Sequence, residues 1–237
     1  MPSRRGQKPF KTNSECVEEV VCQTVTLAKW AIITALKKPP LLFEATITYG
    51  DVLGGMGGFI SGYRHFRRQE ENNGPLFEPT AEEMARASDL FVKTRALLSR
   101  STYLEQALWY WGRSSLASLE RDGLLEAMIG LDGLLASGSR YKLGLYGASL
   151  LAHSPDEAEK IAEDLRDLYD KRSSAAHGGM RHAGADGSRA LTSRAATFLG
   201  DAIRAITDLT ERGILDPEKS IAKQIENLIL QRCPLIP

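Results

Sequence analysis

The sequence predicts a mainly α-helical protein: an antiparallel helical bundle, preceded by a small N-terminal region with one helix and a candidate β-hairpin. Three observations predict this class. From residue 79 onward, apolar residues recur every three or four positions in one segment after another. Residues typical of helix starts precede these segments, and glycines follow several of them. The connections are short, which favours antiparallel neighbours, and no unit of about 20–50 residues repeats as in a solenoid.

The composition is that of an ordinary globular chain. Of 237 residues, 43% are hydrophobic and 25% charged, and 30 basic residues balance 30 acidic ones. A contact with a polyanion would therefore have to come from a local patch. No signal peptide and no apolar run of about 20 residues is recognisable, so we expect a cytoplasmic protein that does not bind membranes. The three cysteines, Cys16, Cys22 and Cys233, lack zinc-site spacing and are expected to be reduced thiols.

Residues 1–78 form the first of three expected segments, and their role is unassigned. Helical spacing predicts a helix over about 14–36, which "KKPP" ends. Residues 43–49 alternate in polarity as a strand does and are expected to pair with 59–66. The connection "GDVLGGMGG" lacks the endings of phosphate-binding loops and is interpreted as a turn.

Residues 79–215 are expected to form the bundle, and 216–237 a C-terminal helix and tail. The first bundle helix opens with a capping box of Thr80 and Glu83. The stripe of that helix expected to be buried comprises Met84, Ala87, Leu90, Phe91, Thr94 and Leu98.

The next bundle helices are expected from about Ser101, from Asp122 and over 141–152. The first of these contains the aromatic run Trp109, Tyr110 and Trp111. Such residues could stack on bases, but aromatic side chains on a bundle helix more commonly belong to the core.

The fifth bundle helix has the clearest start, with Ser154 as N-cap, Pro155 at the first helical position and Glu157 completing a capping box. A sixth helix is expected from about 189 to 212, ended by Gly213, and a last one from Asp216.

A motif near the end of the fifth bundle helix raises the question of function. Arg172 and His177 are separated by four residues, and two glycines follow. A structural interpretation is sufficient, since cations in the last turn complement the helix dipole and glycine commonly ends a helix. The alternative is a catalytic pair, because histidine exchanges protons near neutral pH while arginine stays charged and binds phosphate.

Three stretches between residues 119 and 179 resemble the Apea-like branch of the HEPN superfamily (higher eukaryotes and prokaryotes nucleotide-binding). "LLEAMIGLDGLL" (124–135) is similar to the family helix with an acidic residue in an aliphatic frame, although Asp132 stands where Glu is more usual. "YKLGLYGASLLA" (141–152) is similar to its short middle helix, and "IAEDLRDLYDKRSSAAHGG" (161–179) to its signature helix. Ser173 follows the arginine, as it often does in this branch.

The resemblance implies a HEPN-like bundle and a metal-independent RNA endonuclease of the toxin or antiphage-defence type, working as a homodimer without a cofactor. It gives the catalytic roles to Arg172 and His177. An antitoxin or another regulatory protein is a further expected partner. The sequence leaves open a second function, a non-catalytic HEPN module that binds a protein partner or a nucleotide.

The spacing of the motif bears on the expected dimer. Five residues along an ideal helix place Arg172 and His177 about 140° apart and displaced by about 7.5 Å along the axis. One helix therefore presents the pair poorly unless it unwinds at 176–178. Two antiparallel copies at a two-fold axis could instead bring both pairs into one composite site.

Other residues are candidates for supporting roles. Arg181, His182 and Arg189 could bind flanking RNA phosphates, or they could belong to a polar loop. Tyr169 and Ser173 are expected to support the catalytic pair, and no metal ligands are expected. Asp132 is either a hydrogen-bonding partner for the region of Arg172 or a solvent-facing side chain.

Overall fold

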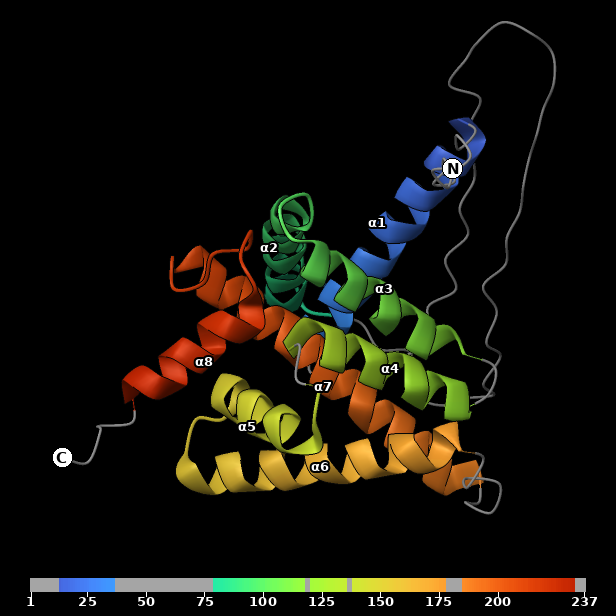
Figure 1. Cartoon of the computed structure of the whole chain (residues 1–237). Coiled ribbons are helices and arrows are strands. Elements are labelled where there is room, and N and C mark those ends of the chain that lie inside the picture. Colours follow the sequence, from blue (N-terminus) through green and yellow to red (C-terminus); the bar gives the residue numbers. More distant parts are fainter. Residues whose placement is uncertain (1–12, 37–78, 118–119, 136–137, 178–184, 233–237) are drawn as a thin grey trace, which may run out of the picture.

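The computed structural model describes residues 13–36, 79–117, 120–135, 138–177 and 185–232 (Figure 1). These residues form α-helices and no strands, so the mainly helical class is confirmed. The segment expected to form a hairpin, 43–66, lies outside the described residues, as does the expected boundary at residue 78. The helices are α1 (Asn13–Leu36), α2 (Ala81–Leu98), α3 (Thr102–Leu116), α4 (Glu120–Leu135), α5 (Arg140–Leu151), α6 (Pro155–Ala176), α7 (Ala185–Glu211) and α8 (Ile221–Arg232).

Two antiparallel helix pairs flank α7, which runs through the middle of the bundle (Figure 1). The pair α3 and α4 lies on one side and the pair α5 and α6 on another. Glycines allow close approach in both pairs. A Cβ added at Gly147 of α5 would overlap Leu165 of α6, and one added at Gly130 of α4 would lie 2.9 Å from Tyr110 Cβ of α3.

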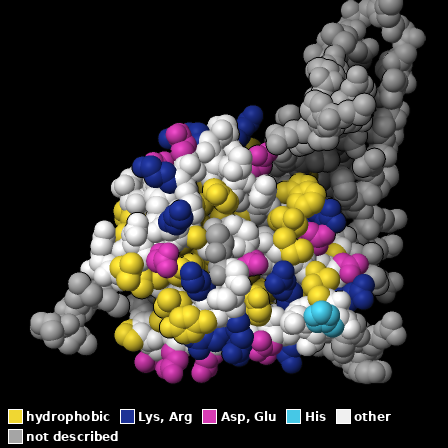
Figure 2. Space-filling model, viewed as in Figure 1, with side chains coloured by type: hydrophobic (Ala, Val, Ile, Leu, Met, Phe, Trp, Pro, Cys, Tyr) yellow, Lys and Arg dark blue, Asp and Glu magenta, His cyan; other side chains and the backbone are white. Residues whose placement is uncertain are grey.

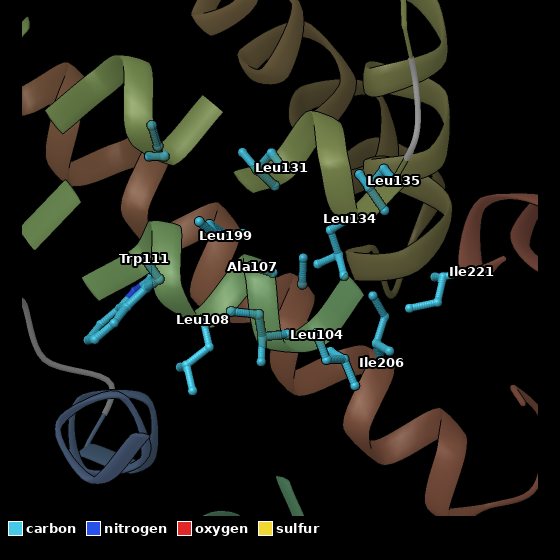
Figure 3. Close-up of a cluster of buried hydrophobic side chains, with 14 of the residues drawn as sticks. Leu104, Ala107, Leu108, Trp111, Leu131, Leu134, Leu135, Leu199, Ile206 and Ile221 are labelled. Carbon is cyan, nitrogen blue, oxygen red and sulfur yellow. The ribbon is translucent and has the colours of Figure 1, made fainter. Parts of the chain in front are cut away.

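One hydrophobic core joins all the helices, with α3, α4 and α7 at its centre (Figure 3). Leucine side chains of α3 and α4 meet Leu199 and Ile206 of α7 there, and Ile221 of α8 closes one end. Leu27, Trp30 and Ala31 of α1 belong to the same core. The described part of the N-terminal region is therefore packed against the bundle.

The helix starts follow the sequence prediction, except that α7 begins at Ala185, about one turn before the expected residue 189. Two further points need correction. The capping box of Thr80 and Glu83 is present, and Ser154 caps α6 by accepting a hydrogen bond from the backbone N–H of Glu157 (3.2 Å). The Glu157 carboxylate, however, accepts its hydrogen bond from the backbone N–H of His153 (2.7 Å). The capping box predicted for α6 is therefore wrong in that one contact, since the glutamate reaches one residue further back.

The second correction concerns the last helix, which begins at Ile221 rather than at Asp216. The side chain of Gln224 occupies both backbone groups of Asp216, accepting from its N–H (2.7 Å) and donating to its carbonyl (2.9 Å). Because these contacts hold 216–220 as a turn, the helix cannot start at the proline that follows Asp216. The preceding stop is as predicted, with Gly213 in the left-handed region at φ +69°.

The predicted buried stripe of α2 is wrong at both ends. Ala87, Leu90 and Thr94 are buried as predicted, but Met84 is 42% exposed. Leu97, at 7% exposure, is more deeply buried than Leu98, which packs only partly against the core. Since Ala87, Leu90, Thr94 and Leu97 follow each other at three- and four-residue steps, the observed stripe is the regular one.

Candidate functional site

The C-terminal end of α6 carries the predicted pair, and the helix stays regular up to Ala176. The last helical residue is Ala176, and His177 is the C-cap, with φ −91° and ψ 11°. The backbone N–H of His177 still donates to the carbonyl of Ser173 (3.2 Å). The imidazole is exposed.

Arg172 lies half-buried one turn before the end of α6. Its guanidinium carbon is 5.6 Å from the ring centroid of Tyr169, within the range of a cation–π contact. Tyr169 is itself packed against the core. Tyr169 is therefore an anchored ring that lies against the guanidinium of Arg172.

The acidic side chains of this half of α6 are neutralised by neighbouring helices. Arg194 of α7 forms ion pairs with Asp167 (2.8 Å) and Asp164 (3.6 Å). Arg140 of α5 forms one with Asp170 (2.9 Å). Within the described residues, Arg172 forms no ion pair with a carboxylate. Its charge is thus available to an anion from outside.

Arg172 and His177 do not share a face of α6. Because the i to i−4 backbone bond of His177 is intact, the two side chains keep the angular separation of about 140° expected of a regular helix. A single protomer therefore does not bring both side chains to one small group.

The other predicted residues have varied surroundings. Ser173 is exposed, and Arg189, also exposed, lies in α7 near the end of α6. Arg181 and His182 lie outside the described residues. The side chain of Asp132 accepts a hydrogen bond from the backbone N–H of Gly138 (3.0 Å), so one of its roles is to hold the connection between α4 and α5.

Two features of this part of the molecule were missed by the sequence prediction. Arg194 and Arg140 were not singled out, although they decide which α6 carboxylates stay free. Trp109 was interpreted as core but is 48% exposed, whereas Trp111 is 3% exposed. Two residues along a helix turn by about 200°, so the apolar stripe that includes Trp111 already puts Trp109 on the opposite side.

The surface seen in Figure 2 mixes basic, acidic and hydrophobic side chains, with acidic ones gathered along the edge formed by the first half of α6. Among the described residues, no three His, Cys, Asp or Glu side chains converge to form a metal-binding group. None of the described helices is both long and apolar enough to span a membrane.

Comparisons with protein-family models, with curated proteins and with solved structures found no match to this chain.

Proposed function

We propose that this protein is a metal-independent RNA endonuclease of the HEPN type, with Arg172 and His177 as its catalytic residues. The observation that carries the proposal is the environment of Arg172. Its guanidinium lies against the anchored ring of Tyr169 and forms no ion pair among the described residues, and an exposed histidine follows five positions later. An arginine that served only to cap the helix would not need Tyr169 beneath it.

The chemistry follows from the two side chains. The 2′-oxygen of a ribose attacks the adjacent phosphorus, and the bond from phosphorus to the 5′-oxygen of the next nucleotide breaks. The His177 imidazole, which can accept or donate a proton, takes the proton from the 2′-hydroxyl or gives one to the departing 5′-oxygen. Arg172 binds the non-bridging oxygens, on which negative charge builds up. DNA lacks the attacking hydroxyl and is expected to be spared.

The proposed site is completed by two-fold pairing of two chains. The pair is split over two faces of α6, so a homodimer in which the C-terminal ends of two α6 helices meet would supply Arg172 from one chain near His177 of the other. The uncompensated arginines would repel each other at such an interface unless an anion lies between them. RNA is therefore expected to tighten the dimer.

We also propose that this chain is a member of the HEPN superfamily. The stretches that resemble the family form α4, α5 and α6, and α5 packs along α6 through Gly144 and Gly147. An intracellular toxin or antiphage effector, held in check by a regulatory protein, is the biological role that this activity would serve.

Cleavage of RNA in the presence of EDTA tests the proposal. Wild type should produce fragments ending in a cyclic phosphate, and Arg172→Ala and His177→Ala should each lower the rate by about 100-fold or more. His153→Ala is the matched control, because His153 is exposed at the opposite end of α6. Arg212→Ala, at an exposed arginine beyond α7, controls for loss of charge.

Two results would contradict the proposal. Equal cleavage by wild type and both site variants would indicate a contaminating nuclease. Absence of cleavage, together with a monomer in sedimentation at micromolar concentration with and without RNA, would favour the non-catalytic module that binds a protein partner or nucleotide.

A further inference from the structure

A second aromatic–arginine contact lies on the same side of the bundle, where α5 begins. Tyr141, in the first turn of α5, is 64% exposed. The guanidinium carbon of Arg166, in the middle of α6, is 5.6 Å from its ring centroid. The contact joins an exposed aromatic ring to a cation, and core packing does not account for it.

Arg166 is held in place by the shape of α5. Gly144 lies one turn after Tyr141, and a Cβ added there would be 3.0 Å from Arg166 Nε and 3.2 Å from its Cγ. It would also be 3.0 Å from the carbonyl oxygen of Ala162. Only glycine therefore leaves room for the arginine side chain to cross α5 and reach the tyrosine.

The charge of Arg166 is not neutralised by the described residues. Its Nε is buried and has no hydrogen-bond acceptor there, and the side chain forms no ion pair. The carboxylates one and four positions further along α6, Asp167 and Asp170, are paired with arginines of other helices. The exposed Glu163 lies one turn towards the start of α6. Uncompensated positive charge therefore extends from Arg166 towards the C-terminal end of the helix.

The two tyrosine–arginine contacts follow one another along α6. Arg166, Tyr169 and Arg172 follow each other at three-residue steps, each of which shifts the side chain by about 60° around α6. The strip of Tyr141, Arg166, Tyr169 and Arg172 thus winds from the start of α5 to the candidate site.

We propose that this strip is a binding track for a single RNA strand, with a base stacked on Tyr141 and a phosphate bound by Arg166. This inference rests on the proposed function, which supplies RNA as the ligand. Aromatic rings alternating with arginines suit a single strand, because every base has a face that can stack and every nucleotide carries a phosphate. The track would hold nucleotides on one side of the bond that Arg172 and His177 cleave.

Fluorescence anisotropy with a short, labelled 2′-O-methyl RNA tests the track without cleavage, since the attacking hydroxyl is blocked. Tyr141→Ala should weaken binding by about 5- to 100-fold, the range for loss of one base–aromatic stack. Tyr141→Phe keeps the ring and should bind within about twofold of wild type. Tyr103→Ala is the matched control, because Tyr103 is an exposed tyrosine on α3.

Arg166→Gln provides an independent measurement. It keeps most of the stem that crosses Gly144 but removes the charge, so the slope of log K against log salt concentration should fall by about 0.7. Thermal unfolding of each variant confirms that it is folded.

The outcomes separate this inference from the proposed function. Unchanged affinity of Tyr141→Ala, or no binding by wild type, overturns the track. Cleavage of ordinary RNA together with unchanged Tyr141→Ala affinity would refute the track and leave the proposed nuclease function in place. Binding that depends on Tyr141 in a protein that cleaves no RNA would support the track and refute the nuclease.

Discussion

The indole N–H of Trp30 donates a hydrogen bond to the backbone carbonyl of Gly200, at 3.2 Å, and joins two residues that are 170 positions apart. Trp30 is fully buried. A Cβ at position 200 would lie 3.2 Å from Trp111 Nε1 and 3.5 Å from Trp30 Nε1, so glycine lets both indoles approach α7. This contact fastens α1 to the helix at the centre of the bundle.

Replacing Trp30 with Phe should therefore destabilise the protein by about 1.5–4 kcal/mol, from lost buried volume and a lost hydrogen bond. Urea unfolding followed by circular dichroism measures this. Trp109→Phe is the control, because Trp109 is half-exposed, and its cost should stay within about 0.5 kcal/mol. Similar midpoints for the two variants would show that α1 unfolds separately from the bundle.

Gly147→Ala should push α5 and α6 apart. The new methyl group would overlap Leu165, which is fully buried and has little room to move, and the expected cost is about 1–3 kcal/mol. Gly133→Ala is the opposite case: nothing lies within 4 Å of a Cβ there. Since alanine is the better helix former, Gly133→Ala should stabilise by up to about 1 kcal/mol. The same urea measurements compare them, and equal effects would contradict the close packing of α5 on α6.

Thr94 of α2 and Thr207 of α7 form a buried hydroxyl pair, with their oxygens 3.2 Å apart. Thr207 donates its own proton to the carbonyl of Ile203 (2.9 Å), so Thr94 must be the donor to Thr207. Replacing either threonine with valine should cost about 1–2 kcal/mol, while the double variant should cost less than the sum of the two. A double-mutant cycle from urea unfolding checks this, and strict additivity would refute the hydrogen bond.

The stability of the turn before α8 should depend on pH through Asp216. A hydrogen bond from Lys219 and one from the backbone N–H of Glu218 hold the pKa of the Asp216 carboxyl below its usual value of 3.8. The carboxylate therefore contributes stability that is fully present above about pH 4 and is lost as the pH falls through the lowered pKa. Thermal unfolding of wild type and Asp216→Asn should differ at pH 6 and converge near pH 2. A difference that persists at pH 2 would mean that the charge of Asp216 is not the cause.

The sequence by itself determined the helices of the described bundle, because the signals that start and stop a helix act within a few residues. Ser154 and Pro155 fix the beginning of α6. Gly213, whose backbone is in the left-handed region, stops the chain from continuing as a helix beyond α7. The motif of Arg172 and His177 was also located correctly at the end of α6, since helical spacing alone places it there. The last helix was misplaced because the side chain of Gln224, eight residues away, holds Asp216 in a turn.

Only the tertiary structure decided which charges remain free. Asp164, Asp167 and Asp170 differ little from one another in the sequence, yet each meets an arginine from α5 or α7, while Arg166 and Arg172 rest on tyrosine rings. Ion pairs and cation–π contacts form between side chains a few ångströms apart in space, and that proximity is set by the packing of helices whose core residues are scattered along the whole chain. The candidate site was therefore visible in the sequence as a motif, whereas its available charge was set by the fold.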